Sequence, residues 1–134
     1  MKPLDSKTSV AGQIMPGDLP SLAASGIGMI VNNRPDGEEP GQPDGSEIAA
    51  AAAAAGLAYR HIPISGGFNL DDVLAMAAAL DAADGHVLAF CKSGTRSTFL
   101  WALAQSEQGA PAAELIAAAA AAGYDISPIA PYLN

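Results

Sequence analysis

The chain lacks the residues from which disulfides and most structural metal sites are built. It has one cysteine and two histidines among 134 residues, so an internal disulfide is excluded and a zinc site would have to rely on carboxylates. No metal-ligand spacing is visible, and we expect neither a metal nor another cofactor. Residues 1–7 are followed by no apolar stretch of the signal-peptide kind, so we expect a reducing, cytoplasmic setting.

Positive charge is also scarce. The sequence contains six Lys and Arg against 14 Asp and Glu, a net charge of -8. A nucleic-acid partner needs a basic face, so none is expected. The longest apolar runs, such as residues 115–122, fall far short of a membrane span, and we expect no membrane partner. Half of the few cations, namely Arg34, Lys92 and Arg96, lie in loops that could belong to one site.

Aromatic residues are few, at 5%, while hydrophobic residues make up 50% of the chain. The core should therefore combine alanine-rich helices with short aliphatic strands. The length fits a single domain over residues 1–134, with its core at about 9–122 and an irregular C-terminal tail.

Strand and helix patterns alternate along the chain. The expected strands cover residues 9–13, 29–32, 57–63 and 86–90, and the expected helices cover residues 18–25, 47–55, 69–83, 97–108 and 111–122. This order predicts an α/β fold with a central, mostly parallel sheet of four to five strands flanked by helices. Ligands of such sheets bind at the carboxyl ends of the strands, where the loops after residues 32 and 90 should meet.

The segment with the strongest chemical signal is Cys91–Arg96 (CKSGTR), between a strand and a helix. Its backbone N–H groups and the helix N-terminus can surround an anion, and Arg96 adds a planar cation suited to oxyanions. A cysteine in such surroundings is commonly a nucleophilic thiolate. The alternative is that Cys91 is a small core residue, but core cysteines seldom precede such a polar segment.

Neighbouring residues of this segment allow more than one role. Ser97 could donate its hydroxyl to the Cys91 sulfur, cap the helix, or do both. Gly94 should supply backbone freedom or clearance, and Lys92 could act electrostatically or simply face solvent. Ser93 and Thr95 complete the expected anion-binding loop.

Three features outside the loop also admit two interpretations. Arg34 could line the pocket and select an anionic donor, or it could pair with Asp36, Glu38 or Glu39. His61 is expected to be structural rather than a base. The acidic pair Glu38-Glu39 is expected to be part of a solvated loop.

The sequence resembles a bacterial family, the phosphatase-like domain of β-lactamase hydrolase-like proteins, sometimes fused to metallo-β-lactamase-type hydrolases. The motifs that carry this resemblance lie at residues 12–19, 31–38, 61–64 and 90–97. The resemblance implies the fold of the cysteine-dependent dual-specificity phosphatases, with the catalytic loop between a strand and a helix. It also implies that a metallo-β-lactamase-type hydrolase could be a partner.

The loop departs from the phosphatase pattern in its length. Protein-tyrosine phosphatases carry five residues between Cys and Arg, whereas only four separate Cys91 from Arg96. That spacing resembles the rhodaneses, which carry sulfur as a cysteine persulfide. The histidine that phosphatases place before the cysteine is replaced by Phe90.

The general acid that phosphatases need is also hard to find. A tyrosine leaving group has a pKa near 10 and must be protonated, yet residues 64–69 contain no acid. Asp36 and Asp71 remain as candidate general acids, and Asp71 looks like a first-turn helix residue.

Three functions follow as hypotheses. The leading one is a sulfurtransferase that carries sulfur from an anionic donor to a thiol acceptor as a persulfide of Cys91, with Arg96 and Ser97 as the other catalytic residues. The second is a phosphatase, a hydrolase acting through a phosphocysteine at Cys91. The third is a non-catalytic anion-binding module. The expected small-molecule partner is thiosulfate, a persulfide or a phosphate ester.

Overall fold

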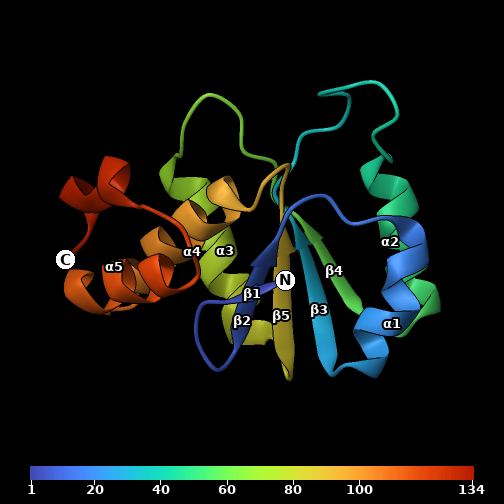
Figure 1. Cartoon of the computed structure of the whole chain (residues 1–134), viewed down its shortest axis with the longest axis horizontal. Coiled ribbons are helices and arrows are strands. Elements are labelled where there is room, and N and C mark those ends of the chain that lie inside the picture. The colour runs from blue at the N-terminus through green and yellow to red at the C-terminus, as the bar shows by residue number, and fades with distance from the viewer.

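A computed structural model describes all 134 residues. Its centre is one five-stranded sheet with strand order β1-β2-β5-β3-β4 (Figure 1). The strands are β1 (Lys2–Pro3), β2 (Thr8–Ala11), β3 (Ile27–Asn32), β4 (Ala58–His61) and β5 (His86–Phe90). Only the pairing of β1 with β2 is antiparallel, so the predicted α/β class and mostly parallel sheet are confirmed.

Helices cover both faces of the sheet (Figure 1). They are α1 (Leu19–Ala24), α2 (Gly45–Ala54), α3 (Leu70–Ala82), α4 (Thr95–Glu107) and α5 (Ala112–Ala121). In Figure 1, α1 and α2 lie on one side of the sheet and α3, α4 and α5 on the other. None of these helices is long and apolar enough to cross a membrane.

Strand β5 forms the middle of the core because its side chains alternate between the two faces. Val87 and Ala89 belong to a cluster of 22 buried residues that also contains Trp101 of α4. Leu88 and Phe90 belong to a second cluster, of 9 buried residues, on the opposite face. All four of these side chains are fully buried, which explains why residues 87–90 form an unbroken apolar run in the sequence.

The ends of the chain are more ordered than the sequence suggests. The two-residue β1 pairs with β2, and a 3₁₀ helix spans Ser127–Tyr132 where an irregular tail is expected. Leu4, Ile126 and Ile129 are buried, so the core extends beyond residues 9–122. Segments this short, one of them rich in proline, carry no periodic pattern from which they could be predicted.

Asn33 joins the carboxyl ends of three neighbouring elements. Its backbone N–H donates to the carbonyl of Phe90 (2.8 Å) and its side-chain amide to the carbonyl of Ile62 (3.0 Å). Its own carbonyl accepts from the N–H of Ile64 (3.0 Å), and its Oδ1 accepts from the hydroxyl of Ser97 (2.7 Å). A fully buried Asn33 thus fixes the loops after β3, β4 and β5 relative to one another.

We predict that Asn33→Ala lowers the free energy of unfolding by about 3 kcal/mol, because it leaves a buried carbonyl and a buried hydroxyl without partners. Chemical denaturation monitored by circular dichroism measures this change. Asn69→Ala is the matched control. Asn69 caps α3 by accepting from the N–H of Asp72 (2.8 Å), as predicted, and its loss should cost about 1 kcal/mol. Equal losses in the two variants would contradict the role given to Asn33.

Candidate active site

The Cys91 loop lies where β5 ends and α4 begins, at the top of the sheet in Figure 1. Helix α4 begins at Thr95, two residues before the predicted start, with Gly94 as its N-cap at a φ of 91°. Cys91 has no exposed surface, yet it belongs to neither hydrophobic cluster. Cys91 is thus buried as completely as the core residues but lies at the edge of the core, where the polar loop begins.

One backbone donor meets the Cys91 sulfur, and other N–H groups of the loop are unpartnered. The N–H of Gly94 points to Cys91 Sγ over 3.1 Å. The N–H groups of the other loop residues have no acceptor within the protein: Lys92, Ser93, Thr95 and Arg96. Together with the positive end of α4, these groups can hold negative charge at the sulfur or on an atom bound to it.

Arg96 lies between the loop and an acidic side chain. Its guanidinium donates to both carboxylate oxygens of Glu38 (2.7 and 2.9 Å) and to the carbonyl of Ile64 (2.9 Å). The hydrogen bonds with Glu38 raise the pKa of Arg96, and the negative charge of Cys91 adds to that effect. The cation expected to meet the substrate is thus already paired within the protein.

Glu38 connects Arg96 to Arg34. The side chain of Arg34 is 1% exposed and donates to Glu38 (2.9 Å), Gln13 (2.9 Å) and Glu39 (3.0 Å). Bonds from Arg96 and Arg34 lower the pKa of Glu38 to about 2. Of the two roles considered for Arg34, the structure shows the pairing role, with Glu38 and Glu39 as partners.

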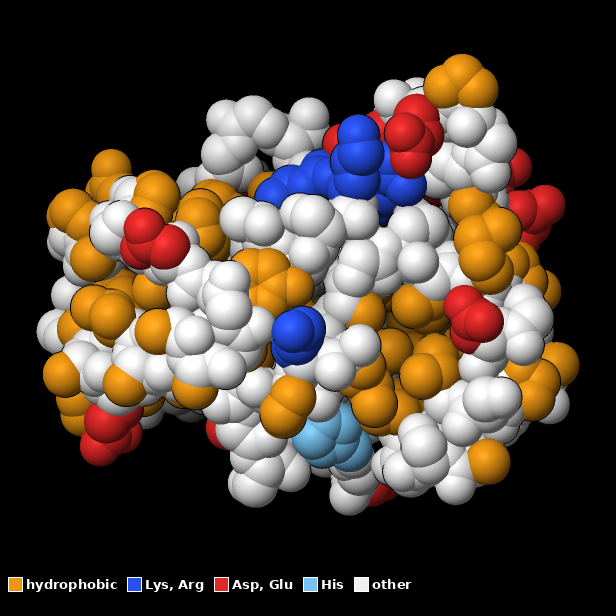
Figure 2. All heavy atoms as spheres, in the orientation of Figure 1, with side chains coloured by type: hydrophobic (Ala, Val, Ile, Leu, Met, Phe, Trp, Pro, Cys, Tyr) orange, Lys and Arg blue, Asp and Glu red, His pale blue; other side chains and the backbone are white.

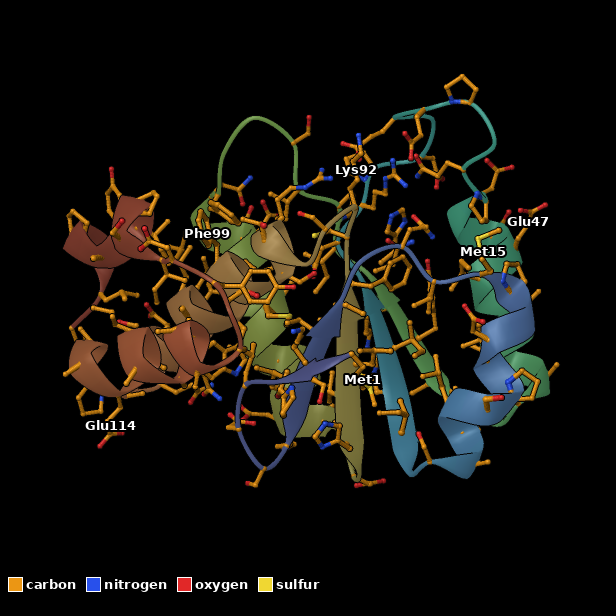
Figure 3. The ribbon with its side chains drawn as sticks, in the orientation of Figure 1. Met1, Met15, Glu47, Lys92, Phe99 and Glu114 are labelled. Carbon is orange, nitrogen blue, oxygen red and sulfur yellow. The ribbon has the colours of Figure 1, made fainter.

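The acidic pair Glu38-Glu39 lies in an exposed loop, as expected, and its carboxylates are in addition paired with cations. Glu38 contacts two arginines, and Glu39 contacts Arg34 and lies 3.7 Å from the ammonium of Lys92. Lys92 itself is 63% exposed, and Figure 3 shows it above the end of β5, beside the loop that follows β3. The pairing with Arg96 and Lys92 could not be predicted, because a charge run reveals nothing about cations elsewhere in the sequence.

Ser97 has neither of the two roles that were expected, donation to the Cys91 sulfur or capping of the helix. It is fully buried and its hydroxyl donates to Asn33 Oδ1, so the single hydroxyl proton is not available to the Cys91 sulfur. It is the third residue of α4 and not its N-cap. Ser97 therefore positions the loop through Asn33. Ser93 and Thr95 contact each other through their hydroxyls over 3.0 Å.

The two candidate general acids make no hydrogen bond to the Cys91 loop. Asp36 accepts from the backbone N–H of Gly45 (2.7 Å) at the start of α2. Asp71 lies in the first turn of α3, where a carboxylate favours the helix dipole. His61 has the structural role that was expected, since its Nε2 lies 3.0 Å from the carbonyl of Arg34.

Tyr124 is a site residue that the sequence did not reveal. Its hydroxyl donates to the carbonyl of Ser93 (3.0 Å), and burial, with a smaller effect from the charge of Cys91, raises its pKa. A Cβ atom at Gly94 would lie 2.2 Å from the Tyr124 hydroxyl. Gly94 thus supplies both expected properties, a left-handed backbone and clearance. No local signal marks Tyr124, because it follows the last helix and reaches the loop only in the folded chain.

Fold and site together define an α/β domain of the phosphatase-like class, with a buried cysteine in the loop between β5 and α4. The family model of the "Beta-lactamase hydrolase-like protein, phosphatase-like domain" matches residues 1–108. The beta-lactamase hydrolase-like protein of Agrobacterium fabrum is 43% identical over 107 residues, which are 79% of this chain and 25% of that protein. The chain therefore belongs to this family, and it spans about a quarter of that relative.

Solved structures confirm the dual-specificity-phosphatase-like fold. A candidate phosphatase from Neisseria meningitidis Z2491 superposes with a TM-score of 0.85 at 32% identity, covering 99% of this chain and 95% of the other. Human DUSP28 superposes with a TM-score of 0.67 at 19% identity, covering 100% of this chain and 86% of the other. The second likeness concerns the fold alone.

We predict that Gly94→Ala destabilises the protein by about 3 kcal/mol, through strain at a positive φ and the clash with Tyr124. Tyr124→Phe removes the clashing oxygen, so the double variant should be more stable than the sum of the two single changes implies. A double-mutant cycle from urea denaturation measures this coupling. Strict additivity would show that Tyr124 does not restrict residue 94.

We also predict that the ion pairs of Glu38 stabilise the protein only above acidic pH. Because the folded-state pKa of Glu38 is lowered from 4.5 to about 2, its contribution is complete above pH 4.5 and is lost as the pH falls toward 2. Glu38→Gln should cost about 1 kcal/mol at neutral pH and progressively less below pH 4.5. Urea denaturation between pH 2 and 7 tests this, with Glu107→Gln on the exposed end of α4 as control. A cost independent of pH would contradict the assignment.

Proposed function

We propose that the domain is a sulfurtransferase that carries sulfur as a persulfide of Cys91. The Cys91 thiolate attacks the outer sulfur of a donor such as thiosulfate, forming a new S–S bond. The donor's S–S bond breaks, and its electron pair leaves on the departing group, here sulfite. An acceptor thiolate then attacks the outer sulfur of the persulfide and regenerates the Cys91 thiolate. The leaving group of each of these two steps is a stable anion.

The observation that carries the proposal is that the carboxylate paired with Arg96 is held as an anion and that two other carboxylates of the same segment have partners of their own. Glu38 is held by two arginines with a pKa of about 2, Glu39 by Arg34, and Asp36 by the N–H of Gly45. A general acid must carry a proton near neutral pH, and Glu38 does not. Sulfur transfer tolerates this arrangement, whereas expulsion of a phenolate or alkoxide does not.

The loop itself supports the same chemistry. Four residues between Cys91 and Arg96 form a shorter ring than the five of tyrosine phosphatases, and one N–H of that ring already meets the sulfur. Because the sulfur is fully buried, the donor's outer atom has to enter the loop to reach it. A single sulfur atom requires less room there than a tetrahedral phosphate.

A phosphatase is the second candidate, and the comparisons favour it over sulfur transfer. The family is described as phosphatase-like, the Neisseria relative is a candidate phosphatase, and the fold is shared with DUSP28. In this case Cys91 would form a phosphocysteine and Arg96 would bind the phosphate after release from Glu38. Such an enzyme would require a general acid from a substrate or a partner.

The matched segment makes up 25% of the Agrobacterium protein. We therefore propose a metallo-β-lactamase-type hydrolase as a partner, either fused or separate, in agreement with the family's name. Such a partner could receive the product that leaves Cys91.

The deciding experiment is the intact mass of the protein after incubation with inorganic polysulfide or thiosulfate. We expect the mass of one added sulfur atom, removed by cyanide as thiocyanate and absent from Cys91→Ser. The control variant Ser21→Ala changes an exposed residue of α1 and keeps the nucleophile, so it should still gain the sulfur. An unchanged mass with both donors, together with Cys91-dependent hydrolysis of an aryl phosphate, would establish the phosphatase instead.

A further inference from the structure

The position of Glu38 restricts the charge of the molecule that can react with Cys91. Arg96 follows the loop, and both oxygens of Glu38 are bonded to its guanidinium. These are the bonds that a bound oxyanion would make with an arginine. The carboxylate of Glu38 thus occupies the position on Arg96 that the second anionic group of a doubly charged donor would need.

Other contacts hold Glu38 in this position. Its Oε1 also accepts from the Nε of Arg34, which is 1% exposed and further bound to Gln13. The carboxylate is only 29% exposed and is ionised throughout the neutral range, as its lowered pKa indicates. A ligand that displaced Glu38 would leave a buried arginine with one partner fewer.

The charges around the loop nearly cancel. Three cations, namely Arg34, Lys92 and Arg96, face the two carboxylates of Glu38 and Glu39. One net positive charge remains, and a thiolate at Cys91 balances it. Figure 2 shows this mixture at the top of the molecule, where Lys and Arg side chains adjoin Asp and Glu side chains. Such a surface does not attract a dianion.

We propose that Glu38 is a specificity-determining residue that selects organic persulfides, whose S–SH group carries at most one negative charge, over dianionic donors such as thiosulfate. This inference rests on the proposed sulfur transfer. With a persulfide R–S–SH, the Cys91 thiolate bonds to the outer sulfur and the S–S bond of the donor breaks. The electron pair leaves on R–S⁻ and the proton stays on the transferred sulfur, so no oxidant or reductant is required. The unpartnered loop N–H groups then meet one small sulfur group instead of a sulfonate.

The test compares how fast two donors load Cys91, measured by intact mass. The donors are thiosulfate and 2-hydroxyethyl persulfide, whose carbon chain is uncharged. Glu38→Gln should raise the ratio of the thiosulfate rate to the persulfide rate on the order of tenfold, the effect of one unit charge across a few ångströms in a partly exposed site. An unchanged ratio would overturn the proposal.

Two variants separate charge from shape. Glu39→Gln removes the same charge from a residue that contacts Arg34 and Lys92 but not Arg96, and it should change the ratio less than about twofold. Glu38→Asp keeps the charge on a shorter side chain and should retain the wild-type preference. A tenfold rise in Glu38→Asp would show that geometry, and not charge, sets the preference, and the proposal would be wrong.

A binding measurement distinguishes failure of this inference from failure of the proposed function. Sulfate is a dianion that cannot transfer sulfur, and iodoacetamide is an uncharged alkylating reagent. Sulfate should slow alkylation of Cys91 in Glu38→Gln and not in the wild type. If no protein forms a persulfide while this protection appears only in Glu38→Gln, sulfur transfer is wrong but the charge selection holds. Equal sulfate protection in both proteins would refute the charge selection under either chemistry.

Discussion

The arrangement of the site depends on the hydrogen bonds of one buried amide, that of Asn33. With its backbone and side chain it joins the loop after β3 to the end of β5, to the segment after β4 and to the start of α4. Parallel strands separated by helices have no turn to fix their ends relative to one another. Asn33 uses both its backbone and its side chain for this purpose. Its hydrogen bonds hold the segments after β3, β4 and β5 in fixed positions relative to one another, and Cys91 lies in the last of these segments.

The positions of the charged residues depend on the hydrogen bonds of Asn33. Arg34 follows Asn33 directly, and Arg96 precedes Ser97, the partner of Asn33. Both arginines are therefore placed by the same bonds, and Glu38 lies between them. A buried charge is stable only when it is paired. The almost fully buried Arg34 therefore needs the carboxylates of Glu38 and Glu39 as partners. The electrostatics of the site are a consequence of how the strand ends are held.

The sequence predicted those features whose signals are local. Strand β5 was predicted at its observed bounds, and the adjacent Cys91 loop and the Asn69 cap were also recognised, because each depends on residues a few positions apart. The partners that determine the site are distant in sequence. The bond from Ser97 to Asn33 spans 64 positions, and that from Arg96 to Glu38 spans 58. One signal was available: Arg34 and Glu38 have opposite charges and stand four apart, but in a proline-rich loop this spacing implies no shared helix face.

The carboxylate of Glu38 is the feature of the site that bears most directly on the choice between sulfur transfer and phosphate chemistry. Cys91 and Arg96 lie at the junction of β5 and α4. A phosphatase needs in addition a general acid that still carries its proton near neutral pH. In this chain the carboxylate nearest to Arg96 is ionised because two arginines stabilise its charge. The same contacts that make Glu38 part of the structure keep its carboxyl without a proton at neutral pH, so the pairing that holds Arg34 and Arg96 also removes Glu38 as a general acid for the proposed reactions.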